Sequence, residues 1–154
     1  MGLFDGVNAA ASGLTAQRLR MDVASSNTAN ADSTRGTLVD GEWEPYRRKM
    51  VTMSSSDSGF SSHLQQAMGS GDRTQAGTGT EVTGIVEDDS PFKQVYNPEH
   101  PDAGEDGYVE MPNVDPLKEM VNMMGASRSY QANITSMNAS KNMMLKALEI
   151  GRGQ

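Results

Sequence analysis

The sequence predicts an α+β protein whose N- and C-terminal helices pair as an antiparallel coiled coil, with a small loop-rich β insert between them. Three observations predict this fold. Apolar residues recur at helical spacing near the N-terminus, a longer heptad pattern fills the C-terminal region, and the middle loses both patterns. We therefore expect residues 1–34 and 112–154 to form an inner coiled-coil domain and residues 35–111 to form an outer, β-containing insert.

The N-terminal helix is predicted over residues 3–31. Gly6 and Gly13 each cost roughly 1 kcal/mol relative to Ala inside a helix, so this helix needs a partner to be stable. The apolar positions at helical spacing are Leu3, Val7, Ala10, Leu14, Met21 and Ala24. We expect two of them, Leu14 and Met21, at an assembly interface.

The polar stretch "SSNTAN" lies at the end of this helix. Small polar side chains allow two backbones to approach closely, and their amides form hydrogen bonds with a neighbouring chain. We therefore expect Asn27 and Asn30 at an interface between chains. The alternative is a simple helix end, at which Asn and Asp side chains bond the nearby backbone.

The middle of the chain has the composition of loops and short strands. Residues 54–62 and 69–80 are rich in Gly and Ser, and residues 97–107 form an acidic, turn-rich loop. Four β-prone runs are predicted as strands, at residues 46–53, 81–87, 92–96 and 108–111.

The C-terminal helix has clear start and stop signals. Asp115 is a candidate N-cap, Pro116 suits the first helical position, and Gly151 is expected as a left-handed C-cap. Between these residues, Leu117 and Met124 widen a heptad seam. The seam consists of Met120, Met123, Ser127, Tyr130, Ile134, Met137, Lys141, Met144 and Leu148.

Methionine is concentrated in this helix: seven of the 12 Met residues lie between Met111 and Met144. Flexible Met side chains suit a surface that packs against several slightly different neighbours. A copper-binding track would cluster more tightly and recruit Cys or His, so packing is the better interpretation. A membrane-surface helix is disfavoured because Lys and Arg do not dominate the polar face.

The charge distribution excludes some partners. The net charge is −7, with −8 in residues 35–111 and +2 in residues 112–154. An acidic chain without a basic stripe argues against nucleic acid. There is no Cys, no signal peptide is recognisable, and no apolar run reaches the ~18 residues of a membrane span. An export route that needs no cleaved signal would therefore be required.

A search for catalytic and metal-binding patterns finds none. His63 and His100 have no metal-ligand spacing, "GTGTEVTG" lacks the Lys-Ser/Thr of a P-loop, and no Ser lies in a GxSxG elbow. The acidic runs lack the alternating ligands of a calcium loop. We expect no catalytic residue, cofactor, metal or small-molecule substrate.

Two long stretches carry a family resemblance. "SGLTAQRLRMDVASSNTANADST" and "EMVNMMGASRSYQANI" resemble the N- and C-terminal signatures of the bacterial flagellar axial proteins, which are rod, hook and hook-junction subunits. The matching residues of the second stretch are Glu119, Met120, Met124, Arg128, Tyr130 and Asn133.

Within that family, the chain is most similar to a proximal rod subunit, through residues 35–51, 107–121 and 142–152. Distal rod and hook subunits commonly carry a Thr-Pro-Gly-Tyr-like turn where this chain has "STRGT". The shape of the insert at 54–106 is not covered by the resemblance.

The resemblance implies a structural, non-enzymatic subunit of a hollow drive shaft that crosses the periplasm and transmits torque from the rotor to the hook and filament. It implies export by the flagellar type III apparatus. The implied partners are copies of the chain, the rod proteins FlgB, FlgF, FlgG and FliE, and the export gate. The resemblance does not decide whether the inner-membrane ring is also a partner. Three alternatives stay open: a sister rod subunit, a free-standing coiled-coil adaptor, and a periplasmic hydrolase that opens the cell wall.

Overall fold

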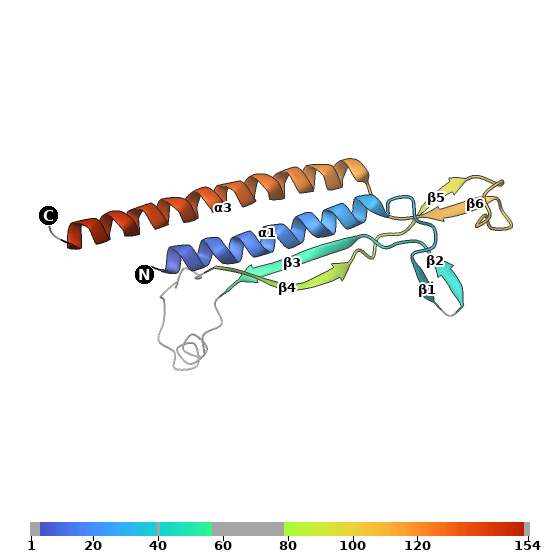
Figure 1. Cartoon of the computed structure of the whole chain (residues 1–154). Helices are drawn as coiled ribbons and strands as arrows, with labels where there is room; N and C mark the ends of the chain where they lie inside the picture. The colour runs from blue at the N-terminus through green and yellow to red at the C-terminus, as the bar shows by residue number, and fades with distance from the viewer. Residues whose placement is uncertain (1–3, 40, 57–78, 153–154) are drawn as a thin grey trace, which may run out of the picture. The chain divides into compact units, whose positions relative to one another are not determined.

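The computed structural model describes residues 4–39, 41–56 and 79–152 (Figure 1). Helix α1 (Asp5–Ala29) comes first and helix α3 (Pro116–Gly151) last. The strands between them form three two-stranded antiparallel sheets, which confirms the α+β class and the small β insert. The strands are β1 (Thr37–Val39), β2 (Glu42–Glu44), β3 (Lys49–Ser55), β4 (Thr80–Glu87), β5 (Lys93–Tyr96) and β6 (Tyr108–Met111).

The chain forms two compact units. Unit 1 contains residues 1–18, 53–83 and 128–154, and unit 2 contains residues 19–52 and 84–127, so each helix contributes to both units. This division differs in kind from the predicted division into a helical core and an insert, which stays a prediction.

Helix α3 begins as predicted and ends differently. The Asp115 carboxylate accepts hydrogen bonds from the backbone N–H groups of Leu117 (3.0 Å) and Lys118 (3.4 Å), which confirms the N-cap. The expected left-handed C-cap at Gly151 is wrong. Gly151 is the last helical residue, and among the described glycines only Gly41 and Gly107 have a positive φ. A hydrogen bond from Arg152 N to Leu148 O completes the last turn.

The strands agree with the β-prone runs of the sequence except at one hairpin. Strands β3, β4, β5 and β6 fall on the four predicted runs, although β3 begins three residues later than expected. The hairpin of β1 and β2, which pairs Leu38 with Trp43, was not predicted. The Asp-Gly pair at 40–41 is a hairpin signal that could have identified it.

A tight turn connects the end of α1 to this hairpin. Gly36 N donates to Glu44 O (2.8 Å), and Tyr46 N donates to Ser33 O (3.1 Å). A Cβ atom on Gly36 would lie 2.6 Å from the backbone N and Cα of Tyr46, so no other residue fits without a backbone shift. The "STRGT" stretch is therefore a closed turn that depends on glycine.

Each unit has a small core. In unit 1 the buried residues are Ala10 and Ala16, and a Cβ on Gly13 would lie 2.7 Å from Asn133 Nδ2, so α1 and α3 approach closely there. In unit 2 the buried residues are Ala24, Asn27, Pro45, Gly107, Val109, Pro112, Val114, Glu119 and Ala126. Among the described residues, no helix is long and apolar enough to cross a membrane.

Candidate assembly interface and its internal support

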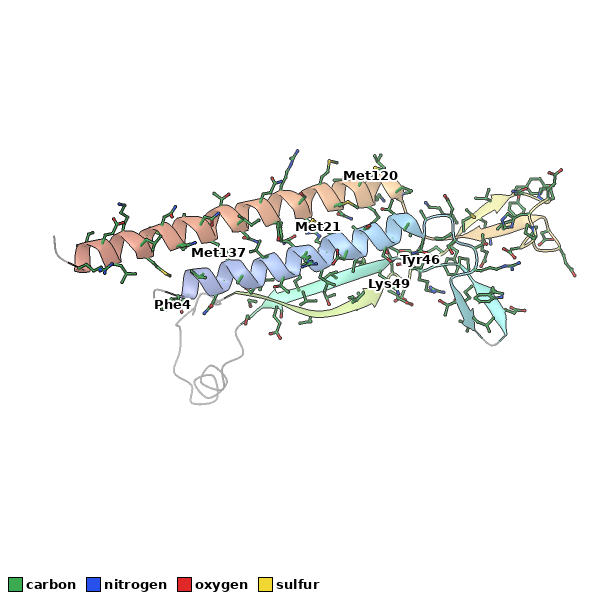
Figure 2. All side chains as sticks on the ribbon, in the orientation of Figure 1. Phe4, Met21, Tyr46, Lys49, Met120 and Met137 are labelled. Atoms are coloured by element: carbon green, nitrogen blue, oxygen red, sulfur yellow. The ribbon has the colours of Figure 1, made fainter. Side chains whose placement is uncertain are left out.

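Asn27 is the centre of a buried polar cluster in unit 2. Its side chain is 0% exposed. Its amide nitrogen donates to Lys49 O (2.8 Å) and to Glu119 Oε2 (3.0 Å). Its amide oxygen accepts from Lys49 N (2.9 Å) and from the Tyr46 hydroxyl (3.0 Å). These four bonds satisfy the amide and join the last turns of α1 to β3 and to the start of α3, near the labelled Tyr46 and Lys49 of Figure 2.

Arg48, the residue before β3, completes the cluster. Its guanidinium donates to Glu119 Oε1 through Nε (2.8 Å) and NH2 (2.7 Å), and to Asp88 Oδ2 through NH1 (3.2 Å). Asn113 accepts from Arg48 N (2.8 Å) and donates to Asp88 O (2.9 Å). Arg48 therefore connects a carboxylate on α3 with another at the end of β4.

Burial and charge pairing act together on these groups. Glu119 is only 2% exposed, so its charge requires the bonds from Arg48 and Asn27. Partial burial works to lower the pKa of Arg48, but hydrogen bonds to Glu119 and Asp88 outweigh it and raise the pKa. Hydrogen bonds from Ser90 and then from Arg48 hold the pKa of Asp88 below its usual value.

A second ion pair ties the acidic loop to the Gly36 turn. Arg35 donates to Asp102 Oδ1 through Nε (2.8 Å), and Thr34 donates its hydroxyl to Asp102 Oδ2 (2.8 Å). These bonds lower the pKa of Asp102. His100 Nδ1 accepts from Asp102 N (3.1 Å), whereas His63 lies outside the described residues. In the described part of the chain, no three His, Cys, Asp or Glu side chains are grouped to hold a metal.

The structure separates the predicted interface residues by exposure. Apart from Asn27, those that are half-buried within the chain are Leu14, Met21, Asn30, Met123, Tyr130, Asn133, Ile134, Met137 and Met144. Those that are exposed are Leu117, Met120, Met124 and Leu148. On α3 the half-buried set keeps the three-and-four spacing of the seam, while the exposed set leaves apolar surface without an intrachain cover.

Asn27 has a different environment from the one expected. The sequence interpretation put it at an interface between chains, but its amide is fully bonded inside the subunit and has no exposed surface. Asn30 is half-buried, and its side chain donates to Ser26 O (2.8 Å), as in a helix end. For Asn27 the structure therefore indicates internal support of the subunit.

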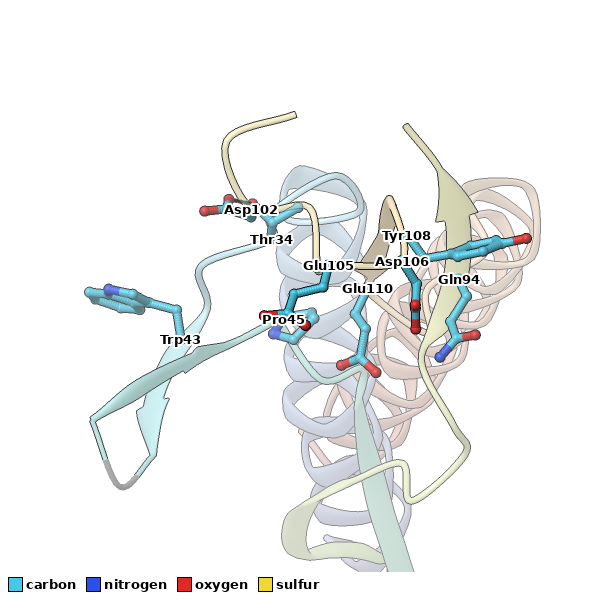
Figure 3. A pocket seen from close by; sticks show the side chains of 10 residues that line it. Thr34, Trp43, Pro45, Gln94, Asp102, Glu105, Asp106, Tyr108 and Glu110 are labelled. Atoms are coloured by element: carbon cyan, nitrogen blue, oxygen red, sulfur yellow. Dashed lines mark hydrogen bonds between the residues drawn. The ribbon is translucent and has the colours of Figure 1, made fainter. Parts of the chain in front are cut away.

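An acidic cavity of about 380 Å³ lies beside the two hairpins of unit 2 (Figure 3). Its walls include the aromatic rings of Trp43 and Tyr108 and the carboxylates of Glu105, Asp106 and Glu110. The cavity therefore offers negative charge and aromatic surface for binding.

Comparison with known proteins assigns the family. The profile described as "Flagella basal body rod protein" matches residues 8–36, and that described as "Flagellar basal body rod FlgEFG protein C-terminal" matches residues 105–150. A relative named flagellar basal-body rod protein FlgC, from Bacillus subtilis (strain 168), is 58% identical over 99% of this chain and 100% of its own length. The chain belongs to the FlgC family.

Relatives with the same name in distant bacteria are also similar over their full length. Identity is 45% with the protein of Salmonella typhimurium and 42% with that of Borreliella burgdorferi, each over 99% of this chain and 100% of the relative. The family resemblance noted in the two terminal signatures therefore extends through the insert, including residues 54–106.

In this FlgC-family chain, sequence reasoning missed the partners of the buried cluster. Glu119 was noticed only as part of a family signature, and Arg48 was not singled out. The two residues are 71 positions apart, and Asn27 and Glu119 are 92 positions apart. The available signal was a lone acidic residue, Glu119, surrounded by the apolar seam, because a charge at such a position needs a buried partner.

Proposed function

We propose that the chain is a structural, non-enzymatic subunit of the rod of the bacterial flagellar basal body. The observation that carries this proposal is the end-to-end match, at 58% identity, to a relative named as a basal-body rod protein. The chain covers the whole length of that relative. The other relatives are likewise named as flagellar basal-body rod proteins.

In this proposal, α1 and α3 pair as an antiparallel coiled coil. Within unit 1, the position of a Cβ on Gly6 is 3.7 Å from Ser140 Oγ, and that on Gly13 is 2.7 Å from Asn133. Residue numbers rise along α1 while they fall along α3, as an antiparallel pair requires. Small residues on α1 favour this contact because they let the two backbones approach closely.

The exposed apolar residues of α3 support assembly with further chains. Leu117, Met120 and Leu148 are each more than half exposed. Such surface is costly for a free-standing monomer and is typical of protein–protein contacts. The proposed interface residues of the subunit are Leu14, Met21, Asn30, Leu117, Met120, Met123, Met124, Tyr130, Asn133, Ile134, Met137, Met144 and Leu148, with Asn27 supporting them from inside.

The buried cluster suits a subunit that carries mechanical load. A neutral bond of 2.9 Å joins Asn27 on α1 to Lys49 on β3, and charge-assisted bonds of 2.7–3.0 Å join Glu119 on α3 to Asn27 and to Arg48, which precedes β3. Such bonds are directional and stronger than neutral ones, so they resist the sliding of one element over another. We infer that this cluster helps the subunit transmit torque without deforming.

The proposal extends to the export route of the subunit and to the rod proteins that it contacts. The subunit is exported by the flagellar type III apparatus and lies in the proximal rod, which crosses the periplasm. It contacts copies of itself and the rod proteins FlgB, FlgF, FlgG and FliE. Each contact is a proposal based on family membership.

Gene deletion tests the proposal. We expect that a strain without this chain forms no rod and does not swim, and that expression of the chain restores both. Electron microscopy of basal bodies and a swimming assay in soft agar provide the measurements. Complete rods in the deletion strain would refute the proposed function.

A further inference from the structure

Two exposed surfaces of unit 2 have no described partner within the chain. The first, the α3 stripe, consists of Leu117, Met120, Val121 and Met124. These residues recur every three or four positions and therefore share one face of the helix. Buried Glu119 and Ala126 lie on the opposite face. Leu117 is 71% exposed, and the Met120 side chain is labelled in Figure 2.

The second surface is the hairpin cavity, which we define by Trp43, Tyr108, Glu105, Asp106 and Glu110. Trp43 is 55% exposed although it is the only Trp of the chain. In the view of Figure 3, the three carboxylates lie between the two aromatic rings. No ion pair within the described residues engages these three carboxylates, whereas the neighbouring Asp102 is held by Arg35.

We propose that the α3 stripe of one copy of this chain packs against the hairpin cavity of the next copy, with Lys118 reaching the carboxylates. This inference rests on the proposed rod function and adds the pair of surfaces by which two copies meet. Leu117 and Met124 contact the Trp43 ring, while Lys118, which flanks the stripe on the next helical position, supplies the opposite charge.

Charge identifies the occupant as a second copy. The segment that contains the cavity, residues 35–111, carries −8, whereas residues 112–154, which contain the stripe, carry +2. Lys118 is exposed, and no carboxylate in the described part of the chain pairs with its ammonium group. Opposite charges at the rim direct the approach of two surfaces and fix their register. An ammonium group near Trp and Tyr rings also gains cation–π attraction.

Both surfaces also include exposed apolar side chains, in addition to their complementary charge. A two-stranded hairpin is marginally stable alone in water, and β1 and β2 expose Leu38 and Trp43. Covering the Trp43 ring with Met and Leu side chains removes apolar area from water on both partners. Flexible Met side chains adapt to the irregular cavity wall.

The contact is heterologous, because different patches of the two copies meet. Such contacts do not saturate in a dimer and instead add subunits in a ring or an open helix. This property fits a subunit that builds a tubular assembly. It also predicts that cross-linking across the contact gives species larger than a dimer.

Cysteine cross-linking tests the pairing because the chain contains no Cys. The double variant Trp43→Cys/Met124→Cys is expressed in a strain that lacks its own FlgC-family chain, and purified basal bodies are oxidised. We expect a ladder of dimers and higher species from the double variant and none from either single variant. The control Glu87→Cys/Met124→Cys, with an exposed residue of β4, should give no ladder.

Three outcomes would overturn the pairing while the rod function stands. These are incorporation of the double variant without a ladder, dimers from Met124→Cys alone, or equal ladders from the control pair. Absence of the unsubstituted chain from basal bodies would instead refute the rod function itself, and the pairing with it.

Charge reversal gives a second readout that does not need cysteine. Lys118→Glu and Glu110→Lys should each reduce swimming several-fold, and the double variant should recover most of it. Circular dichroism of each purified variant checks that folding is unchanged. Failure of the double variant to recover, with folding intact, counts against the contact.

Discussion

At the scale of single residues, the buried cluster explains why a polar stretch lies beside an apolar seam. Asn27 on α1 and Arg48, just before β3, both donate hydrogen bonds to the buried carboxylate of Glu119 on α3. The sequence indicated that the Asn-rich stretch mattered, but it could not show the partners, because 22 to 92 residues separate Asn27 from the groups it bonds on β3 and α3.

Arg48→Met tests the cluster. It leaves Glu119 charged, buried and without its main partner, so we expect a loss of about 3–5 kcal/mol in the free energy of unfolding. The matched control is Lys146→Met, which breaks the exposed pair with Glu149 and should cost less than about 1 kcal/mol. Urea unfolding followed by circular dichroism measures both, and similar losses in the two variants would argue against the cluster.

The acidic ion pairs predict a dependence of stability on pH. The pKa values of Asp88 and Asp102 are lower in the folded chain than in the unfolded one, where Asp titrates near ~3.9. Their stabilising contribution is therefore complete above that pH and is lost as pH falls through the folded-state pKa values.

We expect the unfolding temperature to fall between about pH 5 and pH 2, and Asp88→Asn and Asp102→Asn to flatten that fall. Thermal melts at a series of pH values provide the measurement. An unchanged slope in both variants would show that other carboxylates control acid stability.

At the scale of elements, the helices were the most predictable parts and one hairpin the least. Periodic apolar residues and the Asp115-Pro116 start defined α3, because long periodic segments carry their own signal. The three-residue strands β1 and β2 are too short to show alternation, and their one apolar pair, Leu38 with Trp43, is exposed. Their pairing depends on the Gly36 turn rather than on a buried face.

Two glycines should respond to alanine in opposite directions. Gly36→Ala would place Cβ against the backbone of Tyr46 and should destabilise the chain by roughly 1–3 kcal/mol. Gly125→Ala meets no atom within 4 Å inside α3 and should stabilise the purified chain by roughly 0.5–1 kcal/mol. The urea midpoints of the two variants measure these changes. If both variants are destabilised, the turn geometry at Gly36 does not explain the effect of alanine.

At the scale of the whole molecule, apolar burial is incomplete within a single chain, because large apolar residues of α3 and of the hairpins stay exposed. The heptad seam includes Tyr130, Ile134 and Met137, which are half-buried within the chain. It could not separate intrachain from interchain faces, because periodicity identifies an apolar side without naming what covers it.

Ile134→Asp tests the role of that side in assembly. A carboxylate in the seam must lose water when the helices pack, so we expect loss of incorporation into rods and loss of swimming. Ser136→Asp, at an exposed position of the same helix, is the control and should leave swimming close to normal. Normal motility of the Ile134 variant would exclude the seam from the assembled contact.

The central claim is that this chain is a rod subunit, and cryo-electron microscopy of basal bodies tests it most directly. The basal bodies are purified from cells in which this chain is the sole FlgC-family protein. The account predicts density for α1, α3 and the Asn27–Arg48–Glu119 cluster in the rod, next to the inner-membrane ring. A complete rod whose density contains no copy of this chain would contradict it.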